Sequence, residues 1–144
     1  MAKLVKKPAV IKAAGTPAKE IQEFIGRVNT GTSEASIAKM ISPQGWKEPG
    51  QTPEFNEYTL VLKGSLHARL KNREIVAKAG QAILVKAGDW VQYSTPDPQG
   101  AEYIAVCVPA FSPQTVHRDK NEDNKSNKKA NHRLQRTARQ ARVR

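Results

Sequence analysis

The sequence predicts an all-β protein built as one closed barrel or sandwich. Between residues 33 and 119 it contains short runs rich in Val, Ile, Leu, Tyr and Thr, the residue types that favour strands. Turn residues, many of them glycine or proline, separate these runs. Short strands joined by tight turns are typical of barrels and sandwiches rather than of alternating strand–helix units. The predicted strands are 33–41, 57–62, 65–70, 73–78, 81–86, 90–95 and 101–108.

An N-terminal arm, residues 1–32, precedes the predicted barrel. Thr16-Pro17 has residue types that cap and begin a helix, and Gly26 could end it. The apolar residues that would share one helical face are Ile21, Phe24 and Ile25. We therefore expect a short helix that packs on the outside of the barrel.

The start of the chain, MAKLVKKPAVIKAAG, carries positive charge but no apolar stretch of the length found in secretory signals. No apolar run elsewhere is long enough to span a bilayer. We therefore expect a cytoplasmic protein without membrane contact.

The net charge of +11 is unevenly distributed. The chain holds 24 Lys+Arg and 13 Asp+Glu, and nine of the basic but two of the acidic residues lie in 120–144. This segment has few bulky apolar side chains, so burial cannot offset its ordering entropy, and we expect a disordered basic tail. Its evenly spaced arginines could contact the phosphates of nucleic acid weakly and without sequence specificity. We expect a solvated tail, and this contact with nucleic acid is the alternative.

Two stretches resemble the motifs of the cupin superfamily. The first reads GWKEPGQTPEFNEYTLVLKG from residue 45, and the second reads GQAILVKAGDWVQYST from residue 80. The positions that match are Gly45, Glu57, Gly64, Gly80 and Gly88. The resemblance covers residues 33–119 and implies a cupin double-stranded β-helix, which is a jelly-roll barrel.

Both motifs lack the histidines that hold metal in the metal-binding cupins. Gln51 and Pro53 stand at the histidine positions of the first motif, and Val91 stands at that of the second. A transition metal in such a site needs about three imidazoles and one carboxylate, and only the carboxylate of Glu57 remains. We therefore expect no metal and no cofactor. His117, after the last predicted strand, is the histidine that could fold back over a barrel mouth.

Strand alternation predicts a cavity around these positions. If Glu57 points inward, as its counterpart does in cupins, Thr59 does so too, because alternate residues of a strand face the same side. The same argument from Val91 places Tyr93 and Thr95 inside. The predicted ligand-binding residues are Gln51, Glu57, Thr59, Val91, Tyr93, Thr95 and His117.

Glu57 is the central residue of this predicted cavity, because a buried carboxylate without a partner is costly. One interpretation is structural, with a hydrogen bond from Glu57 to the Tyr93 hydroxyl or to Gln51. The other makes Glu57 and Tyr93 the polar anchors of a ligand, or a catalytic acid/base pair.

Three functional hypotheses remain open. EFNEYTLVLKGSL and the strands that follow are similar to small bacterial cupins grouped with the ethanolamine-utilisation cupin. That resemblance implies a homodimer, and the family includes an acetate kinase activity that uses ATP. The first hypothesis is a metal-free module that binds a small polar metabolite. The second is a metal-independent enzyme acting on a small carboxylate or phosphorylated substrate, although no Gly-rich phosphate loop is present. The third is nucleic-acid association through the tail.

Overall fold

The structure is a computed structural model that describes residues 1–120. The tail predicted for residues 120–144 therefore lies, from residue 121 on, outside the described residues. Every regular element in residues 1–120 is a strand. The strands are β1 (Ala9–Ile11), β2 (Glu20–Ile25), β3 (Ser36–Ser42), β4 (Trp46–Lys47), β5 (Asn56–Arg69), β6 (Glu74–Lys78), β7 (Ala82–Val85), β8 (Gln92–Thr95) and β9 (Ala101–Val108).

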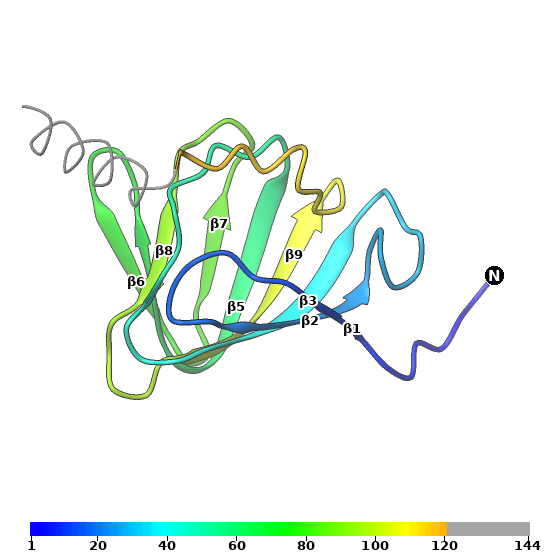
Figure 1. The fold of residues 1–144 in the computed structure, drawn as a ribbon, viewed down its shortest axis with the longest axis horizontal. Coiled ribbons are helices and arrows are strands. Elements are labelled where there is room, and N and C mark those ends of the chain that lie inside the picture. Colours follow the sequence, from blue (N-terminus) through cyan, green and yellow to red (C-terminus); the bar gives the residue numbers. More distant parts are fainter. Residues whose placement is uncertain (121–144) are drawn as a thin grey trace, which may run out of the picture.

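The strands form a curled antiparallel sheet, and the predicted jelly-roll barrel is confirmed (Figure 1). The sheet order is β1-β2-β3-β9-β5-β8-β4, and β6 and β7 also pair with β5. The first part of β5 pairs with β7 and β9, and its last part pairs with β6 and β8. One long strand thus joins the two halves of the barrel.

The turn expected at Lys63-Gly64 is wrong, because β5 continues through both residues. The pairing with β9 shifts register between Val61 and Lys63, and Gly64 has φ +71°. A bulge followed by a glycine with positive φ lets a strand bend from one half of a barrel to the other without ending. The two predicted strands 57–62 and 65–70 are therefore one element.

The N-terminal helix is also wrong, because the chain from Glu20 to Ile25 forms strand β2. This strand pairs with β3 on one side and with β1 on the other. Thr16 does not cap a helix but makes two backbone hydrogen bonds with Lys47, of 3.1 and 3.0 Å. The edge of β3 would otherwise expose unpaired backbone groups, and pairing that edge outweighs the local helical pattern.

The remaining predicted strands lie close to those observed, and residues 101–108 match β9 fully. Inward residues of both halves form the core, in which Trp46, Val61, Leu66 and Val91 are fully buried. No helix long and apolar enough to cross a membrane occurs in residues 1–120.

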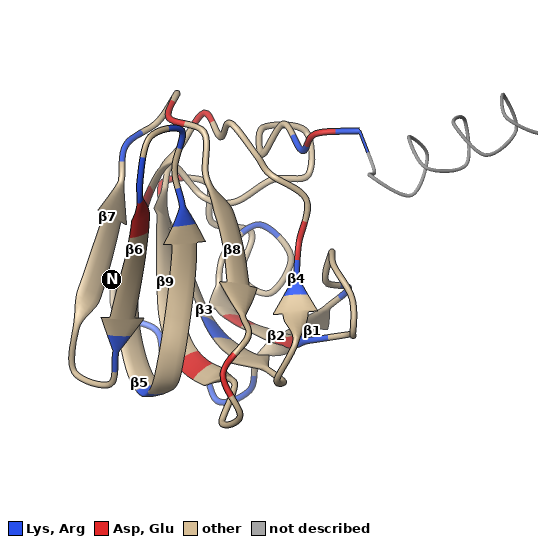
Figure 2. Ribbon diagram, turned by 90° about the vertical axis from the view of Figure 1, so that its left-hand side faces the viewer, with Lys and Arg blue, Asp and Glu red and all other residues tan. Residues whose placement is uncertain are grey.

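The outer face of the half formed by β7, β5 and β9 is apolar. Tyr58, Leu60 and Leu84 are exposed there, and Tyr58 pairs directly with Leu84 on one side and Val106 on the other. β7 carries no charged residue, and the charges of the neighbouring β6 lie at its two ends (Figure 2).

Candidate ligand-binding cavity

A cavity of about 60 Å³ lies inside the barrel. Lys19, in the segment before β2, and Arg118, in the segment after β9, both line it, so both ends of the described chain contribute to the cavity. Figure 1 draws these two segments in blue and orange. At roughly 10–15 Å³ for each water, this space holds about four to six waters or a ligand with a similar number of non-hydrogen atoms. Its polar lining is contributed by Lys19, Glu23, Ser36, Glu48, Gln51, Glu57, Thr59, Tyr93, Tyr103, Cys107 and Arg118.

Glu57 and Thr59 reach the cavity from alternate positions of β5. The Cys107 thiol on β9 donates a weak hydrogen bond to Glu57 Oε2 at 3.4 Å. Burial raises the pKa of Cys107, and the Glu57 carboxylate raises it further, so the thiol stays protonated. Within residues 1–120 no lysine, arginine or histidine nitrogen lies within 4.0 Å of the Glu57 carboxylate.

Tyr93 enters the cavity from β8 and is 5% exposed. Its hydroxyl has no hydrogen-bond partner among the described residues, although the side chain lies beside Glu57. Burial raises the pKa of Tyr93 well above its usual value, and Glu57 raises it further through its charge and through its closeness to the hydroxyl as a hydrogen-bond acceptor. No hydrogen bond of ordinary geometry joins the two side chains, although the Glu57 carboxylate lies close enough to act on the Tyr93 hydroxyl, so the structural and the ligand-binding interpretations both stay open at this contact.

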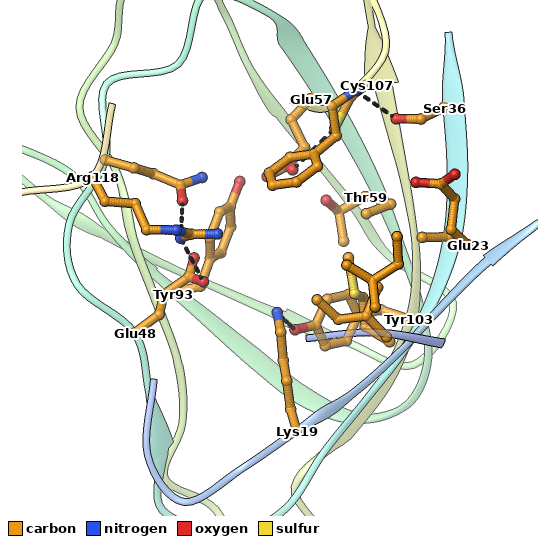
Figure 3. A pocket seen from close by; sticks show the side chains of 17 residues that line it. Lys19, Glu23, Ser36, Glu48, Glu57, Thr59, Tyr93, Tyr103, Cys107 and Arg118 are labelled. Atoms are coloured by element: carbon orange, nitrogen blue, oxygen red, sulfur yellow. Dashed lines mark hydrogen bonds and ion pairs between the residues drawn. The ribbon is translucent and has the colours of Figure 1, made fainter. Parts of the chain in front are cut away.

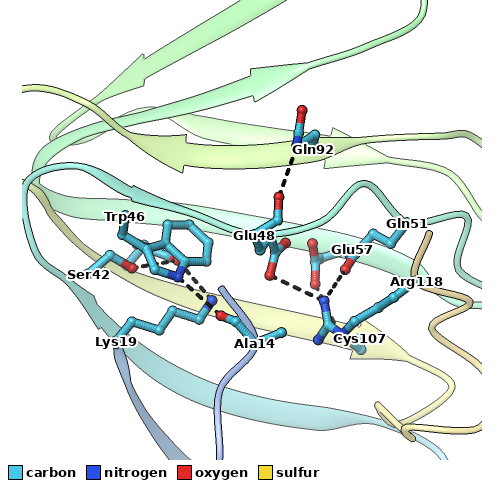
Figure 4. Close-up of polar contacts among 11 residues, drawn as sticks. Ala14, Lys19, Ser42, Trp46, Glu48, Gln51, Glu57, Gln92, Cys107 and Arg118 are labelled. Carbon is cyan, nitrogen blue, oxygen red and sulfur yellow. Dashed lines mark hydrogen bonds and ion pairs between the residues drawn. The ribbon is translucent and has the colours of Figure 1, made fainter. Parts of the chain in front are cut away.

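Arg118 closes the cavity from the segment after β9. Its Nη1 donates to Gln51 Oε1 at 2.8 Å and lies 3.3 Å from Glu48 Oε2 (Figure 4). Glu48 is buried, and burial raises the pKa of its carboxyl, although Lys19 and Arg118 oppose this effect. Gln51 is likewise occupied by Arg118 rather than by Glu57.

Lys19 approaches the cavity from the opposite side to Glu57 (Figure 3). Its Nζ donates to the Tyr103 hydroxyl at 3.3 Å and lies 4.1 Å from the centroid of the Trp46 ring. Burial lowers the pKa of Lys19, but Tyr103, Glu48 and Glu57 oppose burial, and the net pKa is raised. Lys19 is therefore a protonated ammonium held against two aromatic rings.

Glu23 lines the cavity, but its carboxylate accepts hydrogen bonds from the backbone. Its Oε1 accepts hydrogen bonds from the backbone N–H groups of Val28 and Asn29, each at 3.0 Å. The loop after β2 therefore uses this carboxylate. Of the three cavity carboxylates, Glu23 and Glu48 have strong donors, whereas within residues 1–120 Glu57 has one weak thiol hydrogen bond, with the Tyr93 hydroxyl nearby.

The donor set does not fit a cupin metal ion. No group of three or more His, Cys, Asp or Glu side chains in residues 1–120 is arranged to hold one. Gln51 and Val91, which replace two of the histidines, face each other through their backbones, and Gln51 uses its side-chain oxygen for Arg118. No chemical step is therefore assigned to a metal.

Four predicted residues line the cavity: Gln51, Glu57, Thr59 and Tyr93. Val91 and Thr95 are fully buried but lie outside its lining, Val91 in the main core cluster. His117 is exposed, and its Nε2 lies 2.9 Å from Glu54 Oε2. The structure thus places the imidazole outside the cavity and the next side chain, Arg118, inside it.

Sequence reasoning missed Lys19, Glu48 and Arg118. Lys19 lies within the helix expected after Thr16-Pro17, and no local pattern indicates that its side chain reaches the cavity. Glu48 and Arg118 had a usable signal, because Glu48 lies inside the first motif and Arg118 directly follows His117. A charged pair of opposite sign at the two mouth segments would have been a reason to bring them together.

The curled jelly roll with its internal cavity is the fold of the RmlC-like cupins. An RmlC-like cupin from Shewanella frigidimarina superposes with a TM-score of 0.62 at 15% identity, covering 78% of this chain and 94% of its own. Ethanolamine utilization protein Q of Salmonella typhimurium LT2 superposes with a TM-score of 0.56 at 17% identity, covering 73% of this chain and 98% of its own. At such identities the similarity shows the fold.

Residues 46–112 match the family model of the ethanolamine utilisation protein EutQ. The protein is therefore a small cupin similar to EutQ, as its motifs predicted.

A curated relative links this sequence to a larger protein. The endoribonuclease YbeY of Myxococcus xanthus DK1622 is 45% identical over 100 residues, which make up 69% of this chain and 34% of the relative. The chain thus spans about a third of the length of the curated relative that it matches.

Proposed function

We propose that this protein is a binding module that holds a small polar metabolite in the barrel cavity without a metal ion. The Tyr93 hydroxyl supports this function most directly. It is buried and faces the cavity, and it has no hydrogen-bond partner in residues 1–120. A hydroxyl that faces a cavity without a protein partner is free to hydrogen-bond to what fills the cavity, and a hydrogen bond from a ligand contributes about 0.5–1.5 kcal/mol.

The test separates binding from folding. Tyr93→Phe removes only the hydroxyl, which has no protein hydrogen bond of ordinary geometry to lose, so the free energy of unfolding of the ligand-free protein should change by less than about 1 kcal/mol. Binding of small organic acids, amines and alcohols, measured by ligand-observed NMR, should weaken by about tenfold. Tyr58→Phe, on the outer face, is the matched control and should leave binding unchanged.

Glu57→Gln should also lose binding while the barrel stays folded. If the wild-type protein binds none of the acids, amines and alcohols, the binding function is wrong. If Tyr93→Phe destabilises the empty barrel, the hydroxyl has a structural partner, which also contradicts the proposal.

A metal-independent enzyme is the second candidate, because Glu57 and Tyr93 face the same cavity and EutQ is similar in sequence. Glu57 would act as acid or base and Tyr93 would assist. The cavity of about 60 Å³ is far too small for a nucleotide, so ATP would have to bind outside it. Formation of acetyl phosphate from acetate and ATP by wild-type protein, and its loss in Glu57→Gln, is the deciding measurement.

The third candidate is association with RNA. It is favoured by the 45% identity to a protein described as an endoribonuclease and by the nine basic residues in 120–144. Basic side chains bind phosphates by releasing counterions, so binding should weaken steeply with salt. Retention of the full chain on a phosphate-rich resin at moderate salt, compared with a chain ending at residue 119, tests this role. Equal retention would refute it.

A further inference from the structure

We infer that the cavity ligand carries a carboxylate at one end and an ammonium or hydroxyl group at the other, as a short amino or hydroxy acid does. This inference rests on the proposed binding function and specifies its ligand. The carboxylate end would face Lys19, and the donor end would face Glu57 and Tyr93.

The first step is the pairing of charges inside the cavity. Arg118 contacts Glu48 and Gln51, and Glu23 accepts two backbone hydrogen bonds. These groups are satisfied by the protein itself.

Lys19 and Glu57 are the two remaining charged groups of the cavity, and neither has an ion pair in residues 1–120, although Glu48 acts on Lys19 over a longer distance. No carboxylate oxygen in residues 1–120 lies within 4.0 Å of Lys19 Nζ, and no basic nitrogen there lies that close to Glu57. They enter the cavity from opposite sides, with the free space between them (Figure 3). A molecule that bridges this space must therefore offer a negative or accepting group to one and a donor to the other.

The unused hydrogen-bonding capacity agrees with this polarity. An ammonium has three donors, and Lys19 uses one of them on Tyr103. A carboxylate has about four acceptor positions, and Glu57 receives one weak thiol hydrogen bond. Tyr93 adds a free hydroxyl on the side of Glu57. Acceptors for the ligand's donor end thus lie together, and donors for its carboxylate end lie at Lys19.

The size of the cavity limits the chain between the two ends. About 60 Å³ holds roughly four to six non-hydrogen atoms, by the volume that a water needs. β-Alanine and 3-hydroxypropionate have this size and carry both end groups. Propionate keeps only the carboxylate end, and propylamine keeps only the donor end.

The experiment compares these four compounds by NMR titration of the full chain. β-Alanine or 3-hydroxypropionate should bind at least about tenfold more tightly than propionate and propylamine. In Lys19→Met, the compounds with a carboxylate should bind no more tightly than propylamine. In Glu57→Gln, the compounds with an ammonium or hydroxyl group should bind no more tightly than propionate. Lys39→Met is the matched control, because Lys39 is paired with Glu102 away from the cavity lining. This variant should not change the ranking of the four binding affinities.

The outcomes distinguish the ligand class from the binding function. If small molecules bind in a Tyr93-dependent manner but propionate or propylamine equals the two-ended compounds, the inference is overturned and the binding function stands. If no small acid, amine or alcohol binds at all, the binding function itself fails. If Lys39→Met changes the order as much as Lys19→Met does, the effect is one of general charge, and the assignment of Lys19 is wrong.

Discussion

Arg118 and Gln51 are joined by a hydrogen bond of 2.8 Å between Nη1 and Oε1 and by a backbone bridge. Arg118 lies after the last strand, and Gln51 lies in the first motif before β5. The contact therefore ties the end of the described chain to the position where a metal-binding cupin has a histidine. The amide occupies this position as an acceptor for a guanidinium, and the same guanidinium neutralises Glu48.

Arg118→Met should destabilise the protein strongly. The substitution removes the cation in direct contact with the buried Glu48 and leaves only the more distant Lys19, and breaking a buried ion pair by removing one partner costs up to about 3–5 kcal/mol. Because Arg118 is partly exposed, we expect the lower part of that range. The free energy of unfolding in urea measures the loss.

The double variant Arg118→Met, Glu48→Gln provides the control. Removing the charge of Glu48 together with its partner should restore part of the lost stability, because no buried carboxylate is left without its contacting cation, while Lys19 loses the charge of Glu48. A double variant as unstable as Arg118→Met alone would show that Arg118 acts through packing rather than through its charge.

Gly64→Ala should destabilise the bend in β5. Gly64 has φ +71°, and an added Cβ would clash with the carbonyl oxygen of Gly100. Positive φ costs a residue with a side chain about 1–2 kcal/mol, and the clash adds to this cost. Gly80→Ala is the matched control, because Gly80 has φ +84° with nothing within 4 Å of the new Cβ. Equal losses of stability in the two variants would show that the clash is relieved.

The sequence predicted the barrel well because its signals are local. Alternation of apolar residues and the turns between them identify strands such as β9, and the spacing of glycines and Glu57 identifies the cupin arrangement. The same alternation placed Glu57, Thr59 and Tyr93 on the correct side of their strands.

The mouth of the cavity was not predictable in the same way. Residues 20–25 have apolar spacing that suits a helix, and they form a strand only because the edge of β3 offers hydrogen bonds. Lys19 and Arg118 come from segments without regular alternation, so their direction depends on long-range contacts with Trp46 and Gln51. Such long-range contacts cannot be predicted from local sequence patterns.

We predict that the apolar outer face binds a second copy of the chain. Leu60 and Leu84 are exposed on neighbouring strands, and Lys63 and Glu102 at the border carry both signs of charge. A two-fold interface places the same surface of both copies face to face. The basic residue at the border of one copy can therefore pair with the acidic residue at the border of the other. The wild-type protein should be a dimer by light scattering, and Leu60→Glu with Leu84→Glu should be a monomer. Val76→Glu, at another exposed position, is the control and should stay dimeric. A monomeric wild-type protein at all concentrations would refute the interface.

His67 should make stability fall as the pH rises above neutrality. Its Nδ1 lies 2.6 Å from Glu74 Oε1, and its Nε2 lies 2.7 Å from Asp97 Oδ2, so both ring nitrogens face carboxylates and favour the protonated ring. Burial lowers the pKa of His67, but the hydrogen bonds and charges of Asp97 and Glu74 outweigh burial, and the pKa is raised.

A raised pKa means that the folded state binds the proton more tightly than the unfolded state does. The stabilising contribution of His67 is therefore complete below the unfolded pKa of about 6.5 and is lost as the pH rises through the higher folded pKa. Unfolding free energies measured from below pH 6 to above pH 8 should decline in the wild-type protein and decline less in His67→Gln. Asp97→Asn removes one of the two carboxylates and should lower the pKa of His67 in an NMR titration. An identical pH slope in the wild-type protein and His67→Gln would mean that another group controls the decline, because a histidine that binds its proton equally in both states contributes no slope.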